Sequence, residues 1–122
     1  MMRPESLREA LSDMAAQRGF QAAALVELDG GMVWHAEGDA ALCDAVVSTV
    51  SDYWRLYRRN REVFSPVGEL QVAILFHRAA RITVSECGPG LILVIITDRD
   101  ADVDWERWKK AHARLSKGLR AA

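Results

Sequence analysis

The chain has 122 residues, of which half are hydrophobic and 27% are charged, and its formal net charge is −1. A chain of this length and composition can bury a hydrophobic core as one domain, so we expect a single folded domain over residues 1–122 and not a disordered segment. The near-neutral charge excludes a global preference for nucleic acid or for an anionic membrane.

The N-terminal residues lack the apolar segment of a secretory signal. The longest strongly apolar run, Leu91 to Thr97, is far shorter than the ~20 residues of a membrane-spanning helix. The two cysteines, Cys43 and Cys87, form no CxxC pair and no disulfide framework. These features predict a reduced, cytoplasmic protein without membrane insertion, in which each cysteine is a small buried side chain.

The N-terminal segment predicts an amphipathic helix, which Pro4 can start and Gly19 can stop. Its apolar residues recur at helical spacing, namely Leu7, Leu11 and Met14. Two short extended runs follow, 22–28 and 32–37, on either side of an Asp-Gly-Gly turn. This pattern predicts a β-hairpin.

Residues 40–60 predict one long helix with Asp39 as its N-cap. Its apolar arc spans roughly 180°, whereas a helix that covers one sheet needs only about 100°. We expect one side of the arc to contact the sheet of its own domain: Leu42, Val46, Val50, Tyr53 and Tyr57. The other side is then free for another partner: Cys43, Val47 and Trp54, with Val50 shared. The surplus arc predicts an interaction module.

Residues 69–76 alternate between two sets of side chains, which predicts a strand. We expect its buried face to carry Leu70, Val72, Ile74 and Phe76. Residues 81–87 alternate again, and after a Gly-Pro-Gly turn the run 91–97 has no polar side. Such a run is typical of a strand in the middle of a sheet that helices cover on both faces. A last helix begins near Asp102 or Asp104 and carries one apolar stripe: Trp105, Trp108, His112, Leu115 and Leu119.

The predicted element order is therefore α-β-β-α-β-β-β-α. It implies an α/β (α+β) sandwich, in which a five-stranded antiparallel sheet has the final strand at its centre and helices on both faces.

This order, together with the stretch GFQAAALVELDGGMV at residues 19–33, resembles the Roadblock/LC7 family and in particular its bacterial-type, small-GTPase-associated members. The resemblance runs from about Leu7 to Leu119 and includes the apolar last strand before the C-terminal helix. It implies a non-catalytic dimerisation module that forms homodimers or heterodimers with a related domain. Members of this family scaffold or regulate small Ras-like GTPases.

In the dimers that this resemblance implies, the middle helices lie together and the third strands join at the sheet edges. Transferred to this chain, the expected dimer interface contains Cys43, Val47, Val50, Trp54, Glu69, Gln71, Ala73 and Leu75. Of the two tryptophans outside the C-terminal helix, we expect Trp54 more than Trp34 to lie exposed at an interface.

The residue pattern gives no support for catalysis, for a cofactor or for a metal. A phosphate-binding loop ending in Gly-Lys-Ser/Thr is missing, and the three histidines lie on different predicted elements. Alternating aspartates at positions 98, 100, 102 and 104 are similar to the start of a calcium loop, but Val103 occupies the glycine position. We expect these carboxylates to cap the last helix instead.

Four arginines form a basic patch at the end of the long helix: Arg55, Arg58, Arg59 and Arg61. The simplest interpretation is that cations are favourable at a helix C-terminus. The alternatives are docking to an acidic surface of a protein partner or contact with a phosphate backbone, and the lack of a wider basic face weighs against nucleic acid.

An alternative function is a sensory domain of the profilin, PAS or GAF kind, which holds a small ligand in a cavity of a similar helix-covered sheet. Such a cavity needs inward-facing polar side chains. The predicted strands carry large aliphatic residues instead, which favours the interaction module.

Overall fold

The computed structural model describes residues 3–120. Its elements in chain order are α1 (Pro4–Ala15), β1 (Phe20–Glu27), β2 (Val33–Gly38), the π-helical segment η1 (Leu42–Val46), α2 (Val47–Arg59), the 3₁₀ turn η2 (Ser65–Val67), β3 (Val72–Phe76), β4 (Ala80–Glu86), β5 (Leu91–Asp98) and α3 (Trp105–Arg120). None of the helices within this range is long and apolar enough to cross a membrane.

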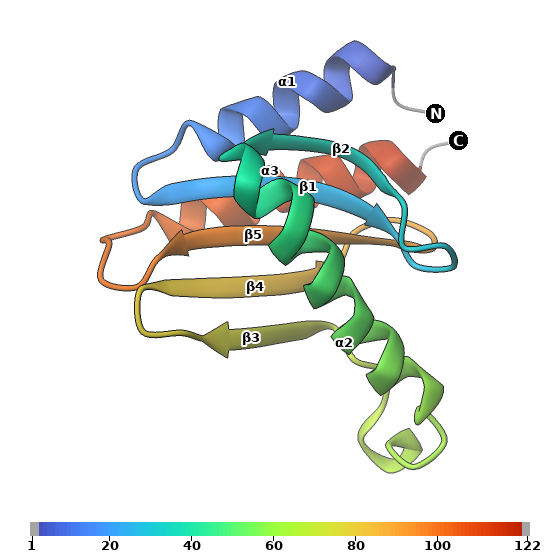
Figure 1. The fold of residues 1–122 in the computed structure, drawn as a ribbon. Helices are drawn as coiled ribbons and strands as arrows, with labels where there is room; N and C mark the ends of the chain where they lie inside the picture. The colour runs from blue at the N-terminus through green and yellow to red at the C-terminus, as the bar shows by residue number, and fades with distance from the viewer. Residues whose placement is uncertain (1–2, 121–122) are drawn as a thin grey trace.

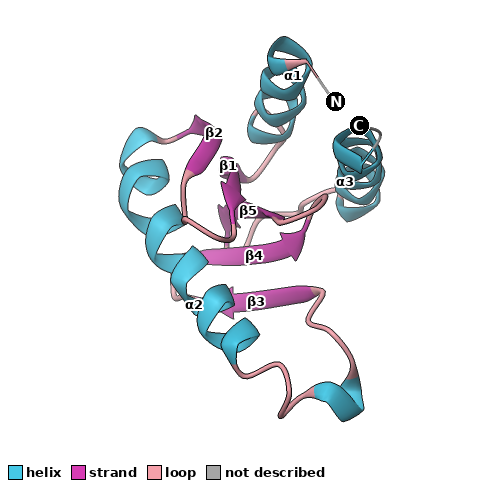
Figure 2. Ribbon diagram, turned by 90° about the vertical axis from the view of Figure 1, so that its right-hand side faces the viewer, coloured by secondary structure: helices cyan, strands magenta, loops and turns pink. Residues whose placement is uncertain are grey.

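The five strands form one antiparallel sheet in the order β2-β1-β5-β4-β3. Helix α2 crosses one face of the sheet, and α1 and α3 cover the other face (Figures 1 and 2). The predicted fold class, the hairpin of β1 with β2 and the central position of β5 are therefore confirmed.

Strand β5 has no polar side because alternate residues enter two different cores. Ile92, Val94 and Ile96 face α2, in a cluster with side chains of β1 and β4. Leu91, Leu93 and Ile95 face α1 and α3, in a second cluster. All six side chains are buried, so burial on both faces fixes this strand at the centre of the sheet.

Two aspartates begin helices, as the sequence predicts. The backbone N–H of Leu42 donates to Oδ1 of Asp39 at 3.1 Å, and the N–H of Arg107 donates to Oδ1 of Asp104 at 3.0 Å. Each carboxylate thus pairs a backbone donor that the first helical turn leaves free.

The predicted helix over 40–60 is present, but η1 changes its winding. The N–H of Val47 donates to the carbonyl of Leu42, five residues earlier instead of four. A π-helical turn of this kind rotates the residues before it relative to the residues after it. One wheel with 3.6 residues per turn therefore cannot describe the whole segment.

Strand β3 differs from its prediction in two respects. It begins at Val72, and its inner and outer faces are reversed. Ala73 and Leu75 pack towards the α2 core, whereas Val72, Ile74 and Phe76 are exposed. Both alternating sets are apolar, so alternation alone cannot identify the inner one. The buried cluster on the α1 and α3 face contains no β3 residue, so the larger set remains at the surface.

Candidate functional site

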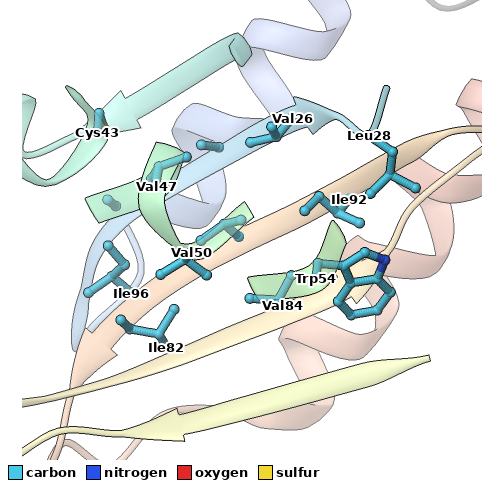
Figure 3. Packing of buried hydrophobic residues seen from close by; sticks show 13 residues of the cluster. Val26, Leu28, Cys43, Val47, Val50, Trp54, Ile82, Val84, Ile92 and Ile96 are labelled. Atoms are coloured by element: carbon cyan, nitrogen blue, oxygen red, sulfur yellow. The ribbon is translucent and has the colours of Figure 1, made fainter. Parts of the chain in front are cut away.

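The side of α2 that faces its own sheet is the reverse of the predicted one. Cys43, Val47, Val50 and Trp54 lie in the core over β1, β5 and β4 (Figure 3). Val47 is fully buried and Trp54 is only 5% exposed. These four side chains therefore fill the core of their own domain, and the side of α2 that is free to meet a partner carries other residues.

The surface of α2 includes Tyr53 and Tyr57, which the wheel pattern predicts to lie against the sheet, and also Leu56, for which the pattern predicts no role. Tyr53 and Leu56 expose 55% and 54% of their area. The ring of Tyr57 stacks on Phe64, with a centroid distance of 4.2 Å and an interplanar angle of 14°. A shallow groove of about 270 Å³ joins this surface, lined by Tyr53, Leu56, Tyr57, Asn60, Val63 and Phe64. We call these six residues the outer α2 surface.

The relative exposure of the two tryptophans is also the reverse of the expectation. Trp34 is 39% exposed, and its Nε1 donates to Oε2 of Glu27 at 2.9 Å. Trp54 is buried instead, so it is a packing residue and not an exposed anchor.

Strand β3 leaves one row of backbone groups unpaired by its own sheet. The carbonyl of Gln71 accepts from Glu86 and the N–H of His77 donates to Ala80, so both residues point their backbone groups at β4. In an antiparallel strand this direction alternates residue by residue. Val72, Ile74 and Phe76 therefore direct their N–H and C=O groups to the free edge of the sheet.

This edge lacks the features that usually prevent strand pairing. Residues 72–76 contain no charge and no proline. The opposite edge strand, β2, carries His35 and Glu37 and has an irregular register against β1. Charges and bulges of that kind discourage pairing with another chain. The two edges thus differ in chemistry, and β3 is the one suited to accept a further strand.

The other predicted interface residues lie at or near β3. Glu69 and Gln71 precede the strand, and Gln71 is exposed, whereas Ala73 and Leu75 are partly buried against the α2 core. Ile74 was not predicted as an edge residue, because the alternation was interpreted with the larger apolar set buried.

The four arginines at the end of α2 lie close together. They line one cleft of about 430 Å³ with Leu28 and Asp29 from the turn after β1. Arg55 forms an ion pair with Asp52, and its Nη1 donates to the hydroxyl of Ser51 at 3.3 Å. Arg58, Arg59 and Arg61 form no ion pair with any residue within 3–120.

The predicted packing role of His112 is confirmed. Its Nε2 and the hydroxyl of Ser85 share a hydrogen bond of 3.0 Å, and its ring lies against Trp108. Burial lowers the pKa of His112, and a hydrogen bond with the Glu86 backbone acts in the opposite direction. The neutral imidazole is therefore the form that the folded protein prefers.

We expect this histidine to make the free energy of unfolding depend on pH. The unfolded chain takes up a proton near the ordinary histidine pKa of about 6.5, before the folded chain does, so stability is full above that pH and falls as the pH drops below it. Urea unfolding at pH 7 and pH 5.5 should show this loss, and His112→Gln should reduce it. An unchanged pH slope in the variant contradicts this assignment.

Both cysteines are free and buried. Burial raises the pKa of Cys87 to about 12. Burial also raises the pKa of Cys43, and the nearby carboxylates of Asp44, Asp39 and Glu37 raise it further. Both thiols are thus held in their unreactive, protonated form. Within residues 3–120, no three side chains of His, Cys, Asp or Glu are grouped so that they could hold a metal ion.

Comparison with known proteins identifies the fold. No protein-family model matches the sequence, and no curated protein is significantly similar to it. Three solved structures with the same fold are a Roadblock/LC7 domain from Streptomyces avermitilis (23% identity, TM-score 0.72, covering 93% of this chain and 92% of that one), MglB from Myxococcus xanthus (16%, 0.76, 96% and 92%) and the gliding protein MglB from Thermus thermophilus (18%, 0.70, 95% and 87%). A further MglB structure is described as having a tetrameric arrangement.

Proposed function

We propose, on the premise of this Roadblock/LC7 fold, that the protein is a non-catalytic dimerisation module that scaffolds or regulates a small Ras-like GTPase in the cytoplasm. The observation that carries the proposal is the unprotected edge of β3 next to the outer α2 surface. An edge strand without charge, proline or bulge is a template for another strand. The two free, buried thiols fit a reducing compartment.

A second copy of the chain fits this edge best with the two-fold axis at Ile74. Ile74 of one copy then lies opposite Ile74 of the other, and Val72 lies opposite Phe76. These are the residues whose backbone groups point outward, so every pair exchanges hydrogen bonds. This register uses the full five residues of β3, whereas an axis at Ala73 or Leu75 leaves part of the strand without a partner. It also places apolar side chains opposite each other on both faces.

The course of α2 supports the same arrangement. Its C-terminal end and the segment 60–71 extend beyond the β3 edge (Figures 1 and 2). In a dimer joined at β3, this overhanging part reaches across to the other copy. The exposed Tyr53 and Leu56 then supply apolar contact area between the two helices. The proposed dimer thus still joins the middle helix and the third strand of each copy. On the helix, the outer α2 surface forms the contact in place of the buried Cys43, Val47, Val50 and Trp54.

The GTPase role rests on the family resemblance and needs its own experiment. Immobilised wild-type protein should retain a small Ras-like GTPase from a native cell extract, identified by mass spectrometry. Purified GTPase is then titrated in the GTP- and GDP-bound forms, with GTP hydrolysis measured in parallel. A difference in affinity or in hydrolysis rate identifies a regulator, and equal values identify a scaffold. If no small GTPase is retained, the GTPase role is refuted while the dimer remains open to test.

The alternative of a sensory domain receives less support. The space between α2 and the sheet is filled by close-packed side chains, among them Val47, Val50 and Ile96 (Figure 3). A ligand cavity between α2 and the sheet would need the volume that these side chains already occupy.

A further inference from the structure

A second cleft adjoins the arginine-lined one at the end of α2. It also has a volume of about 430 Å³, within the usual size range of ligand pockets. Its apolar lining is formed by Leu28, Trp54, Tyr57, Phe64 and Leu70. Trp54 and Leu28 are mostly buried, and the stacked rings of Tyr57 and Phe64 add a flat aromatic surface. We call this the aromatic cleft, and the one lined by the four arginines the arginine cleft.

The two clefts share lining residues and therefore lie directly beside each other. Leu28, Arg58 and Arg61 line both of them. A ligand can therefore place an apolar group in the aromatic cleft and an anionic group in the arginine cleft at the same time. The shared guanidinium groups lie where the two kinds of chemistry meet.

The positive charges of the arginine cleft indicate which anionic group such a ligand carries. Arg58, Arg59 and Arg61 lack an ion-pair partner within residues 3–120, and because they line the same cleft their like charges repel one another. Carboxylates relieve this repulsion, because a guanidinium binds them through two parallel hydrogen bonds. Asp29 supplies only one negative charge in the arginine cleft.

The rim of the aromatic cleft selects among anionic ligands. It carries Glu62, Glu69 and Glu86, and of these only Glu86 is in an ion pair within residues 3–120, with Arg120 at 3.3 Å. Free carboxylates repel a phosphate backbone or a bare anion but accept hydrogen bonds from the N–H groups of a peptide. The site thus offers acceptors at one end, an apolar cleft in the middle and cations at the other end.

We propose that the two adjacent clefts bind a peptide segment of a protein partner, in which a large apolar side chain stands next to two or more carboxylates. The apolar side chain fills the aromatic cleft between Trp54 and the Tyr57–Phe64 pair. The carboxylates bind Arg58, Arg59 and Arg61, and Glu62 and Glu69 accept backbone N–H groups. The site lies next to the proposed dimer contact, because Tyr57 and Phe64 also belong to the outer α2 surface, but it does not use the β3 edge, Tyr53 or Leu56.

Selection from a random dodecapeptide phage library tests this proposal on the folded, full-length chain. The selected peptides should pair an aromatic or large aliphatic residue with adjacent Asp or Glu. One of them, labelled with fluorescein, is then titrated by fluorescence polarisation. Loss of charge-assisted contacts in the double variant R58E/R61E should weaken binding by about tenfold or more. Higher salt should weaken wild-type binding too, because the contacts are ionic.

Further variants distinguish the contribution of each cleft to peptide binding from an effect of misfolding. Phe64→Ala removes the aromatic wall and should weaken binding severalfold, whereas R114E/K117E, which changes two exposed cations of α3, should leave it unchanged. Circular dichroism and thermal unfolding establish that each variant is folded. The proposal is overturned if no peptide is enriched, if the enriched peptides lack carboxylates, or if they bind R58E/R61E as tightly as the wild type.

Discussion

Replacing Ile74 with proline is expected to dissociate the dimer while leaving each protomer folded. The N–H of Ile74 points to the free edge, so proline removes no hydrogen bond to β4, and edge strands tolerate it there. In the dimer, the same change removes both N–H donors at the two-fold axis and leaves two carbonyls without partners. We expect a loss of about 2 to 4 kcal/mol, or roughly thirty- to several-hundredfold in Kd. Analytical ultracentrifugation over a micromolar concentration series measures this shift.

Two further variants show whether the effect comes from the lost N–H. Ile74→Thr keeps the donor, the branched side chain and the strand preference, so it should retain most of the association. Ala73→Pro removes a donor that faces β4 and should destabilise the protomer itself. If Ile74→Pro associates as strongly as the wild type, the β3 edge is not the contact between copies.

Replacing Trp54 with alanine is expected to cost about 3 to 5 kcal/mol in the free energy of unfolding, as is usual for a buried tryptophan. The side chain is 5% exposed and fills the core between α2 and strands β4 and β5 (Figure 3). Its loss leaves a cavity that the surrounding side chains can only partly close. Urea unfolding followed by far-UV circular dichroism measures the change.

The neighbouring Tyr53 provides the matched control. It is 55% exposed, so Tyr53→Ala should alter protomer stability by less than about 0.5 kcal/mol. Both variants are best made in the Ile74→Pro background, where dimer formation adds nothing to the measured stability. A large cost for Tyr53→Ala together with a small cost for Trp54→Ala contradicts the orientation of α2.

Element order and sheet layout could be predicted from the sequence, because they depend on strong local patterns. The run 91–97 has no polar side, which is typical of a strand at the centre of a sheet that helices cover on both faces. The turn at residues 29–31 is short and joins two extended runs, so the two runs are expected to pair with each other as a β-hairpin. Asp39 and Asp104 identify helix starts through a single hydrogen bond each.

Periodicity could not predict which side of α2 faces the sheet, because the helix carries two apolar stripes. The second stripe is shifted from the first by one residue, or about 100° around the helix axis. Val47 and Trp54 belong to one stripe, Val46 and Tyr53 to the other, and Val50 fits both. The π-helical turn in η1 further disconnects the start of the helix from its end. The tyrosine hydroxyl groups could have distinguished the two stripes. Tyr53 and Tyr57 need a hydrogen-bond partner for their O–H when they are buried, whereas Val47 does not, which favours burial of the stripe with Val47.

The face of β3 was ambiguous for a related reason. Either set of alternate residues in 72–76 can form a core, and the choice depends on where α1 and α3 lie, which no local pattern records. The absence of charge from 72–76 is visible in the sequence, but it indicates a pairing role only once the fold places this strand at the edge of the sheet. Convergence of the four arginines with Leu28 and Asp29 depends on the position of a distant turn, so only the fold reveals it.

Disulfide cross-linking at the β3 edge tests the central claim most directly. With the two-fold axis at Ile74, the two Cα atoms of this residue lie about 5.5 Å apart, within the range that a disulfide spans. Ile74→Cys should therefore form a covalent dimer under mild oxidation, seen on non-reducing gels. The native thiols are buried and should not contribute.

The same reaction at neighbouring positions tests the register. Val72→Cys alone should not cross-link, because its two copies lie four positions apart, roughly 13 Å along the strand. A mixture of Val72→Cys and Phe76→Cys should cross-link as a heterodimer. A two-fold axis at Ile74 predicts that Ile74→Cys cross-links with itself and that Val72→Cys cross-links only with Phe76→Cys. Self-linking at Val72, or no cross-link at any of the three positions, contradicts this axis.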